Sequence, residues 1–351
     1  MRICIEGPSW MGLWTEVSEA AIRGLGHQTR VFFHNRKTLL GRLRRKLHGQ
    51  SHNEYMRARL LEALAEHPAD LLLSIQGRLD VPTIERIRAS CPGIRIVYWI
   101  GDPLPLDRYA LAASPEAVDL YLLPTLGLHR QMLERGVGHA VYFPFAISRA
   151  WHLNVRPDVA ERRRFACDVS FVGTHTPERE RMIEYLDARL PERVAVWGRS
   201  WRRARRVRSR GRLHMRDTLK VHACSKIALN LHQGVTANGF NMKLFEIPAA
   251  GGFEITDHQP ALAGTGFGHL MPSYSDLDEL VEQVRFYLAN ETERERRRRE
   301  ILAVMLERHT YEHRFRVLFG TAAEPRPLVA IDGRDIDLTQ RVLPAPVPVQ
   351  V

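Results

Sequence analysis

The sequence predicts an α/β fold of two Rossmann-like domains that face each other across a cleft. Three observations predict this fold. Short apolar runs alternate with helical patterns along residues 2–143. The alternation stops at Phe143-Pro144-Phe145 and begins again at Cys167. The length of 351 residues suits two domains of about 150 residues each.

The first domain opens with a strand, a glycine-containing loop, a helix and a second strand, which is a βαβ unit. The basic and aperiodic run 36–50 is typical of a loop or an irregular helix. Continuous short apolar runs bounded by glycine or proline are typical of buried parallel strands. On this basis we expect strands at 2–6, 29–33, 70–75, 94–100, 120–124 and 139–143. We expect helices at 13–25, 54–66, 81–90 and 126–135.

The second domain repeats this alternation after a basic connecting stretch. We expect its strands at 168–172, 194–197, 227–231 and 253–256. We expect its helices at 178–189, 218–225, 243–249, 277–289 and 293–308. The predicted boundaries are 1–147 for the N-terminal, acceptor-side domain, 148–165 for a linker, 166–308 for the C-terminal, nucleotide-sugar-binding domain, 309–320 for a C-terminal helix that packs back on the first domain, and 321–351 for a Pro-rich tail.

The chain is strongly basic, with a net charge of +11. Much of this charge lies in two runs, Arg199–Arg212 and Arg294–Arg299. Such a balance suits an anionic partner, namely a nucleotide diphosphate, an anionic lipid surface or a nucleic acid. The second run has mixed charge and also fits a solvated helix face. Only Trp201 interleaves the first run, and no known reader motif is present, so a nucleic-acid partner is disfavoured.

Several protein classes are disfavoured by what the sequence lacks. No apolar run approaches the roughly 18 residues of a membrane span, and the N-terminus has no signal-peptide pattern. We therefore expect a cytoplasmic protein. The four cysteines are scattered without CxxC spacing, and the 16 histidines show no HxH or HExxH pattern. Neither a disulfide framework nor a metal site is expected.

The segment 239–252 has the composition of a phosphate-binding turn and helix. Gly239 permits close approach of a ligand, and a helix starting near Asn241 would offer free N–H groups to phosphate. Lys243 adds a positive charge, and Glu246 could accept hydrogen bonds from a ribose diol. The alternative is that Pro248–Gly252 is only a helix end followed by a tight turn.

Four short motifs occur in order: Asp168–Gly173, Ser225–Asn230, Asn241–Asp257 and His309–Arg314. Through them the chain resembles the CgeB-type (spore maturation protein B-like) branch of GT-B glycosyltransferases. The similarity covers most of residues 70–320 and is strongest in 166–320.

This resemblance implies the GT-B architecture and a hexosyltransferase type of activity. It implies a nucleotide sugar, most commonly UDP-linked, bound mainly to the C-terminal half without metal or further cofactor. In related enzymes a Glu-x7-Glu pair marks the donor site. Glu246 matches the second glutamate, the ribose ligand, whereas Asn238 stands in the first position. Lys243 stands where such sequences often have arginine, so the charge is kept without the bidentate fork.

Further candidates follow other strands. After the first strand of the second domain, Gly173, Arg179 and Arg181 could meet a diphosphate, although an ordinary strand–turn–helix joint is an alternative. Gly198 follows the next strand, near the base or the phosphates in a GT-B fold. For Trp201 we favour packing over a ligand contact.

In the first domain, the loop that ends at Gly12 faces the cleft and makes room for the acceptor or the donor phosphate. Asp102 follows the strand 94–100, so the switch-point rule directs it into the cleft as a candidate general base. The competing interpretation is an Asx-turn before Pro103.

The function predicted from these observations is transfer of a sugar from a nucleotide diphosphate sugar to a hydroxyl acceptor. The acceptor would be a glycan, a lipid-linked molecule or a protein. The run Arg199–Arg212 favours peripheral contact with the anionic inner face of a membrane. Two alternatives remain open: a nucleotide-sugar epimerase or hydrolase on the same scaffold, and a non-catalytic nucleotide-sugar binding protein.

Overall fold

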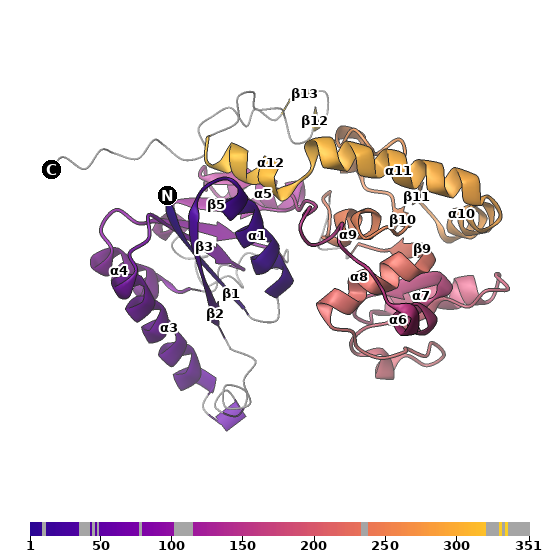
Figure 1. Ribbon diagram of the computed structural model, residues 1–351, viewed down its shortest axis with the longest axis horizontal. Coiled ribbons are helices and arrows are strands. Elements are labelled where there is room, and N and C mark those ends of the chain that lie inside the picture. Colours follow the sequence, from indigo (N-terminus) through magenta and orange to yellow (C-terminus); the bar gives the residue numbers. More distant parts are fainter. Residues whose placement is uncertain are drawn as a thin grey trace.

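The computed structural model shows two α/β halves, each built on a parallel β-sheet (Figure 1). It describes residues 1–8, 12–34, 43, 46–47, 49–76, 79–101, 115–232, 238–320, 330–331 and 334–335. The predicted fold class is confirmed. Most of the run 36–50 and of the tail 321–351 lies outside the described residues.

The first sheet has six parallel strands: β1 (Arg2–Pro8), β2 (Gln28–His34), β3 (Leu71–Ile75), β4 (Arg95–Trp99), β5 (Leu120–Leu123) and β6 (Ala140–Tyr142). Their order is β2-β1-β3-β4-β5-β6. Its helices are α1 (Gly12–Gly24), α3 (Gly49–Glu66), α4 (Val81–Ser90) and α5 (Leu126–Glu134). The strands are apolar on both faces because helices cover both, which explains why continuous apolar runs predicted them.

The second sheet has five parallel strands: β7 (Cys167–Val172), β8 (Ala195–Trp197), β9 (Ser225–Asn230), β10 (Glu254–Asp257) and β11 (Ser273–Tyr274). Their order is β11-β10-β9-β7-β8. The chain therefore changes direction across the sheet between β7 and β9. In open α/β sheets ligands bind beyond the carboxyl ends of the strands at this switch point. The strand order alone therefore indicates a candidate ligand site in the second half, beyond the carboxyl ends of β7 and β9.

The helices of the second half are α6 (Val159–Phe165), α7 (Pro177–Asp187), α8 (Met215–Cys224), α9 (Lys243–Ala249), α10 (Leu277–Ala289) and α11 (Glu291–Arg308). Helix α6 lies where we expected only a linker. The Asp158 side chain accepts the Glu161 N–H, and the Glu161 side chain accepts the Asp158 N–H. This reciprocal cap starts a helix in a stretch whose only fully buried side chain is Phe165.

The chain returns to the first half through α12 (Tyr311–Leu318), which contacts α1 (Figure 1). The crossing is fixed by backbone hydrogen bonds. Ile147 N–H donates to His309 O at 2.8 Å, and Tyr311 N–H donates to Ile147 O at 2.9 Å. The Arg314 guanidinium, which is fully buried, donates to the carbonyls of Pro144 and Phe145. These bonds join the end of the second half to the connecting segment.

The two halves also meet at the turn before α9. Thr125, the N-cap of α5, forms an isolated antiparallel bridge with Gly239, and Leu126 N–H donates to Asn238 O at 3.1 Å. A Cβ at Gly239 would lie 2.4 Å from Thr125 Cβ. Only glycine allows this approach of the two halves. In the described part of the chain, no helix combines the length and the apolar character needed to cross a membrane.

Candidate functional site

Charged and amide side chains gather at the second sheet near the carboxyl ends of β7, β9 and β10, around the switch point. We call the group Arg179, Asn230, His232, Asn241, Lys243, Glu246, Glu254 and Asp257 the polar cluster. Its members come from α7, from α9 and its preceding turn, and from or just beyond β9 and β10. All of them are buried or half-buried. Burial of so many ionisable groups is uncommon in a purely structural core and typical of functional sites.

Two cations of the cluster share one aromatic ring. Lys243 Nζ and Arg179 Cζ each lie 5.5 Å from the centroid of the Phe171 ring in β7. Lys243 Nζ donates to Val172 O at 3.2 Å, and Arg179 donates to the carbonyls of Thr174 and Leu231, both at 2.9 Å. Lys243 and Arg179 each have further N–H groups that these bonds do not use.

Burial disfavours the charged forms of both cations, although the nearby Asp257 partly offsets this effect. Burial, followed by the charge of Arg179, lowers the pKa of Lys243 to about 8. Burial also lowers the pKa of Arg179. A bound anion would relieve the repulsion between the two cations and replace part of the lost hydration.

Glu246 lies one turn further along α9 and is 7% exposed. Burial raises its pKa to about 7, and the charge of Lys243 only partly opposes this effect. Within the described part of the chain, no hydrogen bond joins its carboxyl group to another residue. A carboxylate held in this way is available to accept hydrogen bonds from a ligand diol.

Two asparagines link the start of α9 to the sheet. Asn241 Nδ2 donates to Asn230 Oδ1 at 2.8 Å, and Asn230 Nδ2 donates to Glu254 Oε1 at 2.8 Å. Glu254 is 1% exposed, and its Oε2 has no partner among the described residues. Burial raises the pKa of Glu254 to about 8, so this carboxyl group is mostly protonated at neutral pH.

The last pair of the cluster lies beyond β9 and β10. Asp257 Oδ1 accepts the His232 backbone N–H at 2.8 Å and lies 2.7 Å from His232 Nδ1. Gln259 Nε2 donates to Asp257 Oδ2 at 2.8 Å. Burial alone would raise the pKa of Asp257, but the hydrogen bonds donated by His232 and Gln259 outweigh burial and lower it.

The structure brings together several of the residues singled out from sequence. Lys243, Glu246, Asn241 and Arg179 are members of the polar cluster, and a Cβ at Gly173 would lie 3.3 Å from an Arg179 nitrogen. The expected free helix start is different, because α9 begins at Lys243 and Asn241 Oδ1 already accepts the Leu244 N–H at 3.3 Å. One N–H group at the start of α9 is therefore already bonded within the chain.

Other predicted residues have different surroundings. The Arg181 side chain is exposed on α7. Gly198 has φ +148°, and a Cβ there would lie 1.8 Å from Gly173 O, so this glycine allows two loops to touch. Trp201 is packed, as favoured from sequence, and its Nε1 donates to Gly173 O at 2.8 Å. Gly239 contacts Thr125 instead of lining the polar cluster.

The two candidates of the first half are less fully described. Gly12 begins α1, just beyond the carboxyl end of β1. Asp102 lies outside the described residues.

Four members of the polar cluster, Asn230, His232, Glu254 and Asp257, were not singled out as site residues from sequence. A signal was present for Glu254, because it is an acid inside the predicted buried strand 253–256. For His232 and Asp257 the signal is weaker, because each is a single polar residue at the end of an apolar strand. Their pairing depends on the adjacency of β9 and β10, which the sequence does not reveal.

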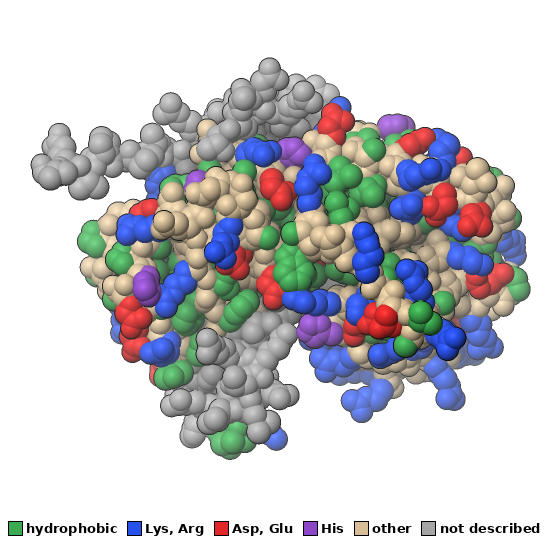
Figure 2. Space-filling model, in the orientation of Figure 1, with side chains coloured by type: hydrophobic (Ala, Val, Ile, Leu, Met, Phe, Trp, Pro, Cys, Tyr) green, Lys and Arg blue, Asp and Glu red, His purple; other side chains and the backbone are tan. Residues whose placement is uncertain are grey.

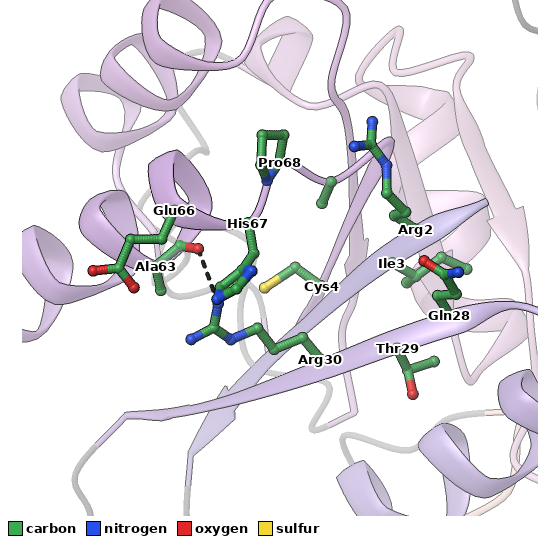
Figure 3. A pocket seen from close by; sticks show the side chains of 11 residues that line it. Arg2, Ile3, Cys4, Gln28, Thr29, Arg30, Ala63, Glu66, His67 and Pro68 are labelled. Carbon is green, nitrogen blue, oxygen red and sulfur yellow. Dashed lines mark hydrogen bonds between the residues drawn. The ribbon is translucent and has the colours of Figure 1, made fainter.

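A pocket of about 450 Å³ lies elsewhere, at the amino end of the first sheet (Figure 3). It lies between the starts of β1 and β2 and the end of α3. Its two arginines are engaged, since Arg30 donates to Ala63 O at 3.4 Å and Arg2 pairs with Asp70 at 2.8 Å. The pocket lies at the amino ends of its strands, whereas ligands of open α/β sheets bind beyond the carboxyl ends. We therefore do not assign the ligand site to this pocket.

A protein-family model matches part of the chain. Residues 177–320 match the model of a protein family described as glycosyl transferase-like. This stretch contains every member of the polar cluster. No curated protein matches the chain by sequence.

Solved structures show the same fold. The alpha,alpha-trehalose 6-phosphate synthase of Burkholderia multivorans aligns over 90% of this chain and 96% of its own, with a TM-score of 0.60 and 13% identity. TarM aligns over 77% of this chain and 58% of its own, with a TM-score of 0.51 and 8% identity. The chain thus has the GT-B fold, two Rossmann-like halves with parallel sheets. Residues 177–320 of its second half match the glycosyl transferase-like family model.

Proposed function

We propose that this protein is a metal-independent glycosyltransferase that binds a nucleotide diphosphate sugar, most simply a UDP-sugar, at the polar cluster. One observation carries the proposal. Two buried cations and a buried carboxyl group lie together at the switch point of the half that carries the glycosyltransferase family domain. A diphosphate needs the cations, and a ribose diol needs the carboxylate. We further propose that the chain represents the CgeB-type branch, on the four motifs quoted above.

In the proposed reaction the bond between the sugar C1 and the diphosphate oxygen breaks, and its electron pair leaves with the diphosphate. The acceptor hydroxyl oxygen forms the new bond to C1, and its proton passes to a base, for which we propose Asp102. Lys243 and Arg179 stabilise the charge that grows on the leaving group. Fixed donors in a buried site are effective in this role because they need little reorganisation.

Glu246 provides the first test of this assignment. In the proposal it binds the ribose, so Glu246→Ala should raise the KM for the donor about tenfold or more, because charged hydrogen bonds contribute about 1.5–3 kcal/mol. Thermal-shift measurements with a panel of nucleotide sugars would first identify the donor. An unchanged donor affinity in Glu246→Ala would remove this residue from the site.

Product analysis separates the alternatives. A transferase releases free nucleotide and a glycosylated product only when the acceptor is present. A hydrolase releases free sugar without acceptor, and an epimerase converts one nucleotide sugar into another. A binding protein would give a thermal shift without turnover.

We also propose that the protein acts in the cytoplasm at an anionic membrane surface, where it meets a lipid-linked acceptor. The support is a group of exposed arginines between β8 and α8, which we call the arginine surface: Arg199, Arg202, Arg203, Arg205, Arg206, Arg208, Arg210 and Arg212. The stretch 193–216 contains no Asp or Glu. In the described part of the chain none of these eight side chains forms a salt bridge, and Figure 2 shows basic side chains gathered along the lower edge of the second half.

The arginines of α11 differ because they are paired. Arg296 bonds Glu293 and Glu300, Arg297 bonds Glu293, and Arg298 bonds Glu295. This contrast offers a matched control for the membrane proposal.

Replacement of Arg203, Arg205 and Arg206 by Gln should weaken binding to phosphatidylcholine vesicles containing phosphatidylglycerol by about 100-fold, at about 1 kcal/mol per arginine. The same replacement of Arg296, Arg297 and Arg298 should change it little. Equal binding of the wild-type protein to vesicles of phosphatidylcholine alone would contradict the membrane proposal.

A further inference from the structure

His232 is held in one orientation by a carboxylate but has an unused nitrogen. Its side chain is 1% exposed, and its Nδ1 lies 2.7 Å from Asp257 Oδ1. The same oxygen accepts the His232 backbone N–H, so two bonds fix the residue. Its Nε2 is fully enclosed and has no partner among the described residues. A buried polar atom left without a partner destabilises the folded protein, so it requires an explanation.

The partner of Nδ1 determines what Nε2 can do. An ionised carboxylate only accepts hydrogen bonds, so Nδ1 of His232 carries a proton. Nε2 is then an acceptor in the neutral ring and becomes a donor when the ring takes up a second proton. A carboxylate that orients and stabilises an imidazolium is a recurrent arrangement in sites that handle developing negative charge.

A second buried histidine with an enclosed, unpartnered nitrogen lacks this arrangement. His152, in the connecting segment, is fully buried and also has an enclosed Nε2 without a partner in the described part of the chain. Its Nδ1, however, accepts the Ser148 N–H at 3.0 Å. No carboxylate is bound to that ring, so nothing stabilises its protonated form. Burial accordingly lowers the pKa of His152 to about 4.

The position of His232 relates it to the two cations. Arg179 donates to the carbonyl of Leu231, the residue directly before His232. The charge of Asp257, the partner of His232, also acts on both Arg179 and Lys243. The histidine, the arginine and the lysine therefore surround the same end of β7 and β9. In that place a phosphate group would meet three donors instead of two.

On the basis of the proposed function, we propose that His232 is a third contact to the leaving diphosphate, made through Nε2 to a non-bridging phosphate oxygen. On binding, the ring takes one proton from the solvent and donates Nε2–H to the anion, while Asp257 remains ionised. No covalent bond forms or breaks at His232 apart from this protonation. The enclosure of Nε2 means that the atoms covering it must shift when the diphosphate enters. The bond then forms away from bulk water, which strengthens it.

The test compares two ligands that differ only in the diphosphate. Isothermal titration of UDP and of uridine would be carried out on the full chain, on His232→Gln and on His152→Gln. A charge-assisted hydrogen bond contributes about 1.5–3 kcal/mol, which is a tenfold to hundredfold change in affinity. His232→Gln should therefore weaken UDP by at least about tenfold and leave uridine within about twofold. His152→Gln should leave both affinities unchanged.

A second measurement uses the wild-type protein and does not depend on how the variants fold. In protein labelled with ¹⁵N-histidine, Nε2 of His232 should move from the shift of an acceptor nitrogen to that of a protonated nitrogen when UDP is added, and should not move with uridine. An Nε2 signal that stays in place with UDP would overturn the inference. So would a His232→Gln variant that binds UDP normally, or one that loses UDP and uridine equally.

Failure of the proposed function gives a different result. If the wild-type protein binds neither UDP nor any other nucleoside diphosphate, the donor site itself is wrong, and the role of His232 is refuted with it. If UDP binds the wild-type protein and Glu246→Ala weakens both UDP and uridine while His232→Gln weakens neither, only the inference about His232 is overturned.

Discussion

Glu254 provides a quantitative test of the buried electrostatics in the polar cluster. Its pKa is about 8 in the folded protein, against an ordinary value of 4.5. A carboxyl group whose pKa is raised by folding stabilises the protein below its ordinary pKa and loses that contribution as the pH rises through the folded value. Each pH unit between these limits costs about 1.4 kcal/mol. From about pH 5.5 to about pH 7.5 the loss is about 2–3 kcal/mol.

Glu254→Gln removes this dependence and keeps the shape of the side chain. Its amide oxygen can still accept the bond from Asn230 Nδ2, which is 2.8 Å long in the wild-type protein. The variant should therefore gain about 2–3 kcal/mol of stability relative to the wild type over the same pH range, whatever the difference between the two proteins at about pH 5.5. The assay is scanning calorimetry at the two pH values, where the difference in Tm should grow by about 5–10 °C for a unit of this size. A difference in Tm that is equal at both pH values would refute the assignment of a protonated, buried Glu254.

Three further predictions follow from other contacts. In His232→Gln, which cannot take up a proton at this position on binding, affinity for UDP-glucose should rise as the pH rises through about 7, where Glu246 ionises, and fall above about 8, where Lys243 loses its charge; titration calorimetry across this range would show a flat profile if neither group binds the donor. Gly198→Ala should destabilise the protein by more than about 2 kcal/mol in urea unfolding, because it adds a contact with Gly173 O to backbone strain. Gly211→Ala is the control, since it has φ +107° and open space around its Cβ, and an equal loss in both variants would remove the role of the contact. Arg314→Met should lower stability by about 3 kcal/mol, because it leaves the carbonyls of the crossing without their donor; an unchanged urea midpoint would contradict this.

The sequence predicted the strands well because both sheets are parallel and covered on both faces, which makes their strands continuous apolar runs. It predicted helix α9 and the polar positions Lys243 and Glu246 because a family motif covers them. It did not predict α6, since Val159–Phe165 contains three arginines and buries only Phe165. The Asp158–Glu161 cap was the available signal for that helix.

The remainder of the site depends on contacts between strands. Glu254 receives a bond from Asn230 only because β9 and β10 are neighbours, and His232 meets Asp257 for the same reason. Neither strand order nor register follows from a pattern of apolar residues. The close approach of Gly239 to Thr125 was not predicted from sequence either, because it joins residues from the two halves.

The most direct test of the donor site measures the affinity for UDP after removal of one buried cation. Lys243→Ala should weaken UDP binding by at least about tenfold in titration calorimetry. Lys226→Ala is the matched control, because Lys226 is an exposed lysine of the same sheet that pairs with Asp168 at 2.6 Å. The account predicts a loss for Lys243→Ala and wild-type affinity for Lys226→Ala. Wild-type affinity in both variants would contradict the placement of the diphosphate at the polar cluster.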